Sequence, residues 1–108
     1  MKPFVSRFPI LAGAIVLSLQ GGYALADNVE RGFVFAKANC SICHAIGLYD
    51  ESPLAIAPPL RTLHELYPVE TLEESLAEGI VTGHPSMPQF QLDGAQINNL
   101  IAYLKSLE

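Results

Sequence analysis

Residues 40–44 of the chain read Cys40-Ser41-Ile42-Cys43-His44. Cys-x-x-Cys-His is the pattern at which c-type haem is attached to proteins. Two thiols separated by two residues can each reach one vinyl group on the same edge of the macrocycle and form a thioether bond. The histidine that follows is then carried beneath the iron and can ligate it as the proximal imidazole. The stretch therefore predicts one covalent haem held through Cys40 and Cys43, with His44 on the metal.

Three other uses of a Cys-x-x-Cys pair compete with haem attachment. A thioredoxin-like redox motif requires a strand before it and a β-α-β context, and neither pattern precedes Cys40. Half of a structural zinc site requires a second pair of ligands at short spacing, whereas His64 and His84 are twenty residues apart. An ordinary structural disulfide is the third alternative. Because the complete five-residue pattern arises rarely by chance, haem attachment is the favoured interpretation.

The sixth position on the iron needs a ligand or is open to substrates. The downstream candidates are Met87, His84 and His64. Met87 lies in the stretch His84-Pro85-Ser86-Met87-Pro88-Gln89-Phe90, where two prolines stiffen an irregular loop, as presentation of a thioether at fixed geometry requires. Methionine more often fills a core, but a core methionine normally lies on a helix or strand face. The sequence therefore predicts Met87 as the second axial ligand.

The first 26 residues have the features of a secretory signal peptide. Lys2 and Arg7 precede the uncharged run Ile10 to Leu19, and Ala24-Leu25-Ala26 places small residues before a cut at Asp27. An uncleaved membrane anchor is the alternative, but a spanning helix needs about 20 apolar residues and this run is half as long. We therefore expect residues 1–26 to be a cleaved, bacterial-type signal and residues 27–108 to form one domain in the periplasm.

The net charge and the length of the chain exclude some classes of function. The whole chain has 108 residues and a net charge of −5. Residues 27–108 keep four basic residues against all eleven acidic ones, so the expected mature domain has 82 residues and a charge of −7. This acidic balance argues against nucleic-acid binding, which requires basic surface. So small a domain also needs help to fill its interior, and a haem would supply a large apolar body.

Apolar spacing and capping residues predict an all-α domain with long loops. We expect helices from Asp27 or Asn28 to about Ala38, over Leu60 to Tyr67, from Thr71 to near Gly79, and from Asp93 to the end. Thr71 with Glu74, and Asp93 with Gln96, have the spacing of capping boxes. Proline-containing loops are expected over Gly47 to Pro59 and over Gly83 to Gln91. The last helix carries a clear apolar stripe, formed by Ile97, Leu100, Ile101, Leu104 and Leu107.

Taken together, these features resemble class I cytochromes c, the monohaem, mitochondrial-type family, and in particular its short bacterial members. The resemblance covers nearly all of residues 27–108. The segments that carry it are Gly32 and Ala36 before the cysteines, the Cys40–His44 motif, Ala57-Pro58-Pro59-Leu60, Met87-Pro88-Gln89-Phe90 and Leu100 to Lys105. The motif is specific alone, and the order of all five segments is very specific. The resemblance implies a small cytochrome c fold of three to five helices around one haem.

The resemblance also implies roles for single residues. Pro58 would accept the second ring N–H of His44 through its carbonyl, which orients the imidazole. Leu60 would pack on the haem face, and Gly32 would let the first helix cross the last one closely against Leu100 and Tyr103.

The chain departs from the larger family members in having no tryptophan and few lysines. Arg61 could pair with a haem propionate, although a lone arginine is more often a solvated surface charge. Tyr67 could hydrogen-bond the Met87 sulfur or a propionate, and its spacing does not decide between them.

The expected function is one-electron transfer between redox partner proteins, a donor dehydrogenase and an acceptor oxidase or reductase, without catalysis of its own. An acidic domain should dock on a basic or neutral surface, with association weakened by salt. Two alternatives stay open. The chain could be the electron-accepting subunit of a periplasmic dehydrogenase, or a haem enzyme or gas sensor whose sixth position is free.

Overall fold

The computed structural model describes residues 3–4, 9, 20–79 and 87–108, and in these ranges it contains helices and loops but no strand. Helix α1 spans Gln20–Asn39, α2 Leu63–Leu66, α3 Leu72–Glu78 and α4 Gly94–Ser106. Short 3-10 helices at Leu60–Thr62 and Val69–Thr71 lead into α2 and α3. The all-α prediction is confirmed. None of the helices in the described part of the chain is long and apolar enough to cross a membrane.

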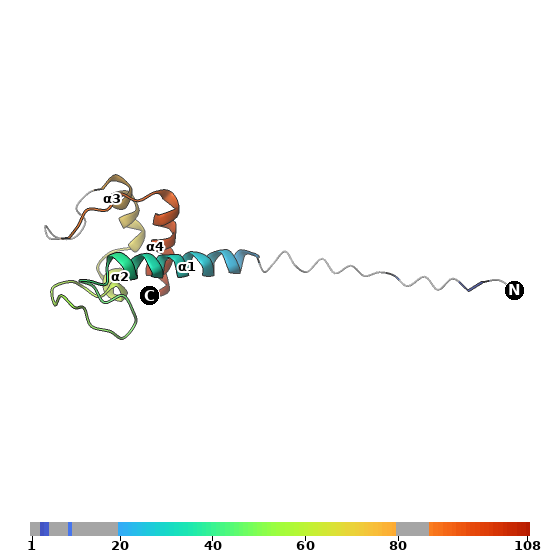
Figure 1. The fold of residues 1–108 in the computed structure, drawn as a ribbon, viewed down its shortest axis with the longest axis horizontal. Helices are drawn as coiled ribbons and strands as arrows, with labels where there is room; N and C mark the ends of the chain where they lie inside the picture. Colours follow the sequence, from blue (N-terminus) through green and yellow to red (C-terminus); the bar gives the residue numbers. More distant parts are fainter. Residues whose placement is uncertain (1–2, 5–8, 10–19, 80–86) are drawn as a thin grey trace.

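Helices α1 and α4 cross each other and form the frame on which the rest is built (Figure 1). The crossing occurs at Gly32, where an added Cβ would lie 2.0 Å from the Asn99 carbonyl oxygen and 2.6 Å from the Tyr103 Cβ. The two backbones can therefore approach this closely only because residue 32 has no side chain. The predicted role of Gly32 is confirmed, and its neighbours on α4 are Asn99 and Tyr103 rather than Leu100.

The core lies on the inner face of α4, against α3 and the two 3-10 helices. All five residues of the predicted stripe on α4 are buried. They pack with the fully buried Val69 and with Leu76 of α3. Asp93 accepts a hydrogen bond from the Gln96 N–H while the Gln96 side chain accepts one from the Asp93 N–H. The capping box predicted there is therefore confirmed.

Two details differ from the sequence prediction. Helix α1 begins at Gln20, several residues before Asp27, and includes Gly21 and Gly22. Glycine makes a helix less favourable by about 1 kcal/mol per residue but does not by itself end one. The capping box at Thr71 is absent. Thr71 has helical backbone angles and its hydroxyl donates to the Pro68 carbonyl at 2.7 Å, since the preceding 3-10 helix already continues into α3. The end of α3 is as predicted, with Gly79 in the left-handed conformation at φ 79°.

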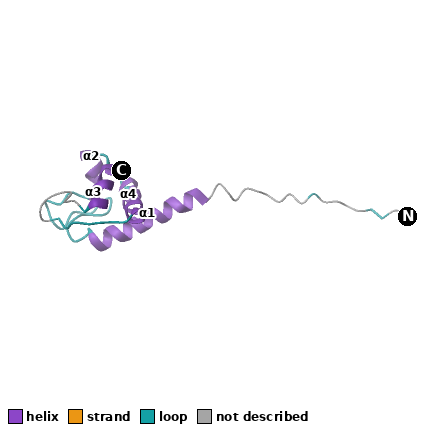
Figure 2. Ribbon diagram, turned by 90° about the horizontal axis from the view of Figure 1, so that it is seen from above, coloured by secondary structure: helices purple, strands orange, loops and turns teal. Residues whose placement is uncertain are grey.

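The first two turns of α1 extend beyond the folded body (Figures 1 and 2). Residues 22–27 are all exposed, and Tyr23 and Leu25 retain 73% and 60% of their accessible surface. Contacts with the rest of the molecule begin near Val29, which packs against the core. This part of α1 therefore contributes little to the packing of the body.

The crossing at Gly32 gives a testable expectation. Gly32→Ala should lower the free energy of unfolding by about 1–3 kcal/mol, because the new methyl group overlaps the α4 backbone. Gly94→Ala is the matched control, since an added Cβ there meets nothing within 4 Å. Chemical denaturation of the two variants measures the difference. Equal stability of Gly32→Ala and the parent protein would contradict the close crossing.

Candidate functional site

A cavity lies between α4, α3, α2 and the segment after α1, and together with its opening to solvent it encloses about 650 Å³ that no atom occupies. Most of its walls are apolar and come from elements far apart in sequence. The residues that line it are Cys40, His44, Pro58, Leu60, Leu63, Tyr67, Leu72, Leu76, Met87, Leu100 and Leu104.

The cysteine and histidine residues enter this cavity directly from the end of α1. The backbone N–H groups of Cys43 and His44 both donate to the Cys40 carbonyl, at 3.1 and 2.9 Å, so the motif forms one tight turn. Cys40 and Cys43 are free thiols in this structure, and both are partly buried. A second hollow adjoins the cavity and shares Cys40, His44 and Met87 with it, while Cys43, Leu54 and Pro88 are among its other lining residues. The two thiols can thus reach one edge of a flat ligand.

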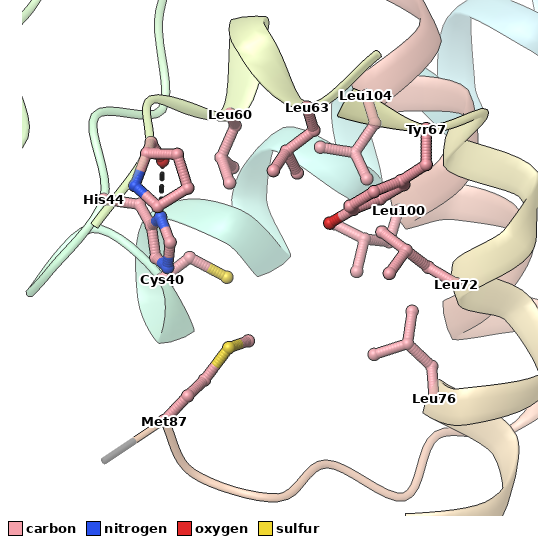
Figure 3. Close-up of a pocket in the computed structure, with 11 residues that line it drawn as sticks. Cys40, His44, Leu60, Leu63, Tyr67, Leu72, Leu76, Met87, Leu100 and Leu104 are labelled. Atoms are coloured by element: carbon pink, nitrogen blue, oxygen red, sulfur yellow. Dashed lines mark hydrogen bonds between the residues drawn. The ribbon is translucent and has the colours of Figure 1, made fainter. Parts of the chain in front are cut away.

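The His44 imidazole is oriented by the loop before α2. Its Nδ1 lies 2.6 Å from the Pro58 carbonyl oxygen, drawn as the dashed line in Figure 3. A carbonyl only accepts, so Nδ1 carries the proton and Nε2 keeps its lone pair. An imidazole in this tautomer is ready to donate its Nε2 lone pair to a metal, and the hydrogen bond makes it a better donor.

Met87 reaches the same cavity from the opposite side (Figure 3). Its side chain points toward the space beside Cys40 and His44, with the thioether group at its end. The segment that follows it is held in place at two points. The Phe90 ring packs edge-on against Phe35 of α1 at 6.1 Å, and the Leu92 N–H donates to the Leu76 carbonyl at 2.8 Å. His84, the second candidate for a sixth ligand, lies outside the described residues. His64 is exposed on α2 and does not line the cavity.

The cavity suits a flat apolar cofactor with a central metal. Its leucines offer no polar group to water, while the Cys40 thiol, the His44 imidazole and the Met87 thioether line it, and the Cys43 thiol lines the adjoining hollow. Those donors are the set that binds a haem covalently and fills both axial positions of its iron. In the described part of the chain, three or more His, Cys, Asp or Glu residues do not gather into a cluster able to bind another metal ion. The half-site interpretation for zinc therefore gains no support.

The surroundings of Cys40 do not favour its thiolate form. Burial raises the pKa of the Cys40 thiol to about 11. Reactive cysteines of thioredoxin-like motifs instead have a lowered pKa, because the thiolate is their nucleophile. Cys40 also follows a helix rather than a strand.

Tyr67 and Arg61 were left without a firm role by the sequence. The Tyr67 hydroxyl points into the cavity (Figure 3), and burial raises the pKa of Tyr67, so the hydroxyl stays protonated and can donate a hydrogen bond. Arg61 turns to the neighbouring loop, where its Nη1 donates to the Asp50 carbonyl at 2.7 Å.

Two residues of the cavity wall, Leu72 and Leu76, were not predicted from the sequence as part of the site. Their spacing of four residues on a short helix was a usable signal.

A chain in which Cys40 and Cys43 are both alanine should bind no covalent cofactor and lose most of its helical circular dichroism. The apolar residues that line the cavity would then have no group to pack against, and a folded state that loses its bound group loses the corresponding stability. Far-ultraviolet circular dichroism compares it with the parent protein. Native-like helicity in the double variant would show that the helices pack without the cofactor.

Comparison with known proteins adds an independent finding. The family model described as cytochrome c matches residues 29–108. A cytochrome c-553-like protein of Synechocystis sp. is 29% identical over 85 residues, which cover 78% of this chain and 73% of that protein. No solved structure shows significant similarity to the chain.

Proposed function

The chain belongs to the cytochrome c family, whose members carry covalent c-type haem and transfer electrons, and from this premise we propose that it is an exported one-electron carrier whose iron is ligated by His44 and Met87. The observation that carries the proposal is the shared cavity. Cys40, His44 and the Met87 thioether line it from two separate segments of the chain, and the other walls are apolar except for the Tyr67 hydroxyl. When bound, the haem supplies an iron that alternates between Fe(III) and Fe(II).

Each residue has a distinct task in this proposal. Cys40 and Cys43 hold the macrocycle, and His44 and Met87 fill both axial positions, so no substrate needs to reach the metal. The Pro58 carbonyl keeps the imidazole in one orientation. Leu60, packed at the cavity wall, is assigned to the haem face. A thioether ligand favours Fe(II) and raises the reduction potential relative to two histidines.

The leucine walls act in the same direction as Met87. They exclude water from the neighbourhood of the metal, and an apolar shell disfavours the form with the greater charge. The filled coordination sphere also changes little in geometry between the two oxidation states. Both features suit a carrier that must accept and release electrons quickly.

The surface beside Cys43 supports docking of redox partners there. Ile42 and Leu54 keep 80% and 39% of their accessible surface, and both line the outer hollow next to the cysteines. Residues 38–49, 52–60 and 87–92 contain no Lys, Arg, Asp or Glu. Partners would therefore meet an apolar rim, with the acidic pair Asp50 and Glu51 between two of these ranges. Transient complexes between redox proteins typically bury a small interface area.

The first 26 residues are proposed to be a signal that is removed on export to the periplasm. Two observations support this. The family match begins at residue 29, and residues 22–27 are exposed along the projecting part of α1. The remaining domain would be residues 27–108.

Absorption spectra of the exported protein in both oxidation states test the proposal. We expect a haem that acid acetone does not extract, and a methionine–iron charge-transfer band in the oxidised form that is absent from Met87→Ala. Gln89→Ala is the matched control, since this neighbouring side chain is exposed and does not line the cavity. A colourless protein, or an extractable haem, would overturn the proposal.

Carbon monoxide separates a carrier from a haem enzyme or gas sensor. The reduced parent protein should bind it poorly, because Met87 occupies the sixth position, whereas reduced Met87→Ala should bind it readily. A difference spectrum under carbon monoxide measures both. Ready binding to the parent protein would favour the open-site alternative instead.

The net charge predicts opposite salt effects for two small oxidants. The domain of residues 27–108 has a charge of −7. Its oxidation by ferricyanide, an anion, should therefore accelerate between ionic strengths of about 0.01 and 0.15 M, because salt screens the repulsion. Oxidation by the cation tris(phenanthroline)cobalt(III) should slow over the same range. Stopped-flow rates measure both, and the reverse signs would show that the charge at the docking surface is positive.

A further inference from the structure

The backbone directly after His44 is fixed by a side chain from the following loop. Ala45 is 1% exposed, so its peptide groups have little access to water. Its N–H donates to the Ser52 hydroxyl oxygen at 3.0 Å, and its carbonyl accepts from the Leu60 N–H at 2.9 Å. The peptide units on both sides of Ala45 are therefore held, one by Ser52 and one by the segment that also contains Pro58.

The loop that carries Ser52 is closed by a second group of contacts. The Asp50 carboxylate accepts from the N–H groups of Ile46 at 3.2 Å and Gly47 at 2.9 Å. Arg61 donates to the carbonyls of Asp50 at 2.7 Å and Gly47 at 3.3 Å, and lies 3.8 Å from the Asp50 carboxylate. The Tyr103 hydroxyl of α4 donates to the Ile46 carbonyl. The loop is thus connected to Arg61 and, through Tyr103, to α4.

These contacts bear on the imidazole because they join the same two backbone segments. The hydrogen bond from His44 Nδ1 to the Pro58 carbonyl spans from the segment after α1 to the segment before α2. Its length and direction depend on how those two segments lie relative to each other. The contacts of Ser52, Asp50 and Arg61 help to hold that relative position.

We propose that Ser52 is a positioning residue for His44, with the Asp50–Arg61 pair holding the Ser52 loop in place. Ser52 acts through the Ala45 N–H to set the plane of the imidazole and the strength of its hydrogen bond to Pro58. Arg61 therefore serves the histidine side of the site rather than a haem propionate. The inference rests on the proposed ligation of iron by His44.

Ser52→Ala, studied as the haem-loaded protein, tests the role. Three quantities are measured: the hyperfine shifts of the four haem methyl groups in the oxidised form, which report the plane of the axial imidazole, the reduction potential, and the exchange rate of the Ala45 amide proton. We expect a changed order or spread of the methyl shifts, a shifted potential and at least tenfold faster exchange. Ser52→Thr keeps the hydroxyl and should restore all three.

Thr71→Ala is the matched control, because it likewise removes a hydroxyl that is hydrogen-bonded to the backbone, in this case by donating to the Pro68 carbonyl on an exposed turn before α3. It should leave the three quantities unchanged. Methyl shifts and potential in Ser52→Ala equal to those of the parent protein, with faster Ala45 exchange, would overturn the inference and leave Ser52 a purely local role.

If Ser52→Ala yields no haem-loaded protein, Asp50→Asn tests the positioning role in its place. It keeps the size of the side chain but removes the charge that faces Arg61. A changed methyl pattern supports the positioning role, and an unchanged pattern overturns it. Failure of the underlying proposal is recognised separately, since the parent protein would then itself lack a histidine-ligated haem.

Discussion

The close crossing of α1 and α4 at Gly32 determines where the chemistry is placed. Since the two backbones approach each other there, the end of α1 must emerge beside the inner face of α4. Cys40 follows directly, and the Leu100 and Leu104 side chains of α4 already face the same cavity. A bulkier residue at position 32 would push the helices apart and separate the thiols from that apolar wall. The core and the cofactor site are therefore parts of one packing arrangement.

The loops position the remaining residues of the site. Between α1 and the 3-10 helix that starts at Leu60 the chain has no helix or strand, yet its backbone groups form hydrogen bonds at intervals. The Leu54 N–H donates to the Cys43 carbonyl and the Leu60 N–H to the Ala45 carbonyl. Buried peptide groups are costly when unpaired, so these bonds give the segment one path. The loop that carries Met87 is anchored similarly through Phe90 and Leu92. Both potential iron ligands thus come from irregular segments that neighbouring contacts hold in place.

Much of this arrangement could be predicted from local sequence, and the part that could not depends on the path of the loops. The five-residue motif, the α4 stripe and the Asp93 cap are local patterns, and each is found where it was predicted. The start of α1 was misplaced because glycine weakens a helix without ending it. The Thr71 cap failed since the preceding 3-10 helix had already set the backbone angles. The contact of Ser52 with Ala45 has no signal in the sequence, because only the folded loop brings the two together.

The crossing of α1 and α4 also has a consequence for the order in which the molecule can form. Gly32 lies near the start of residues 27–108, whereas Asn99 and Tyr103, which it approaches, lie near the end. Closing so long a loop is entropically costly, and folding slows as contacts become less local. When the chain emerges with its N-terminus first, α1 is available before α4. The two helices cannot pack against each other until α4 has followed. Until then the thiols remain accessible on an open chain, which is the state in which a large rigid group can be attached with the least hindrance.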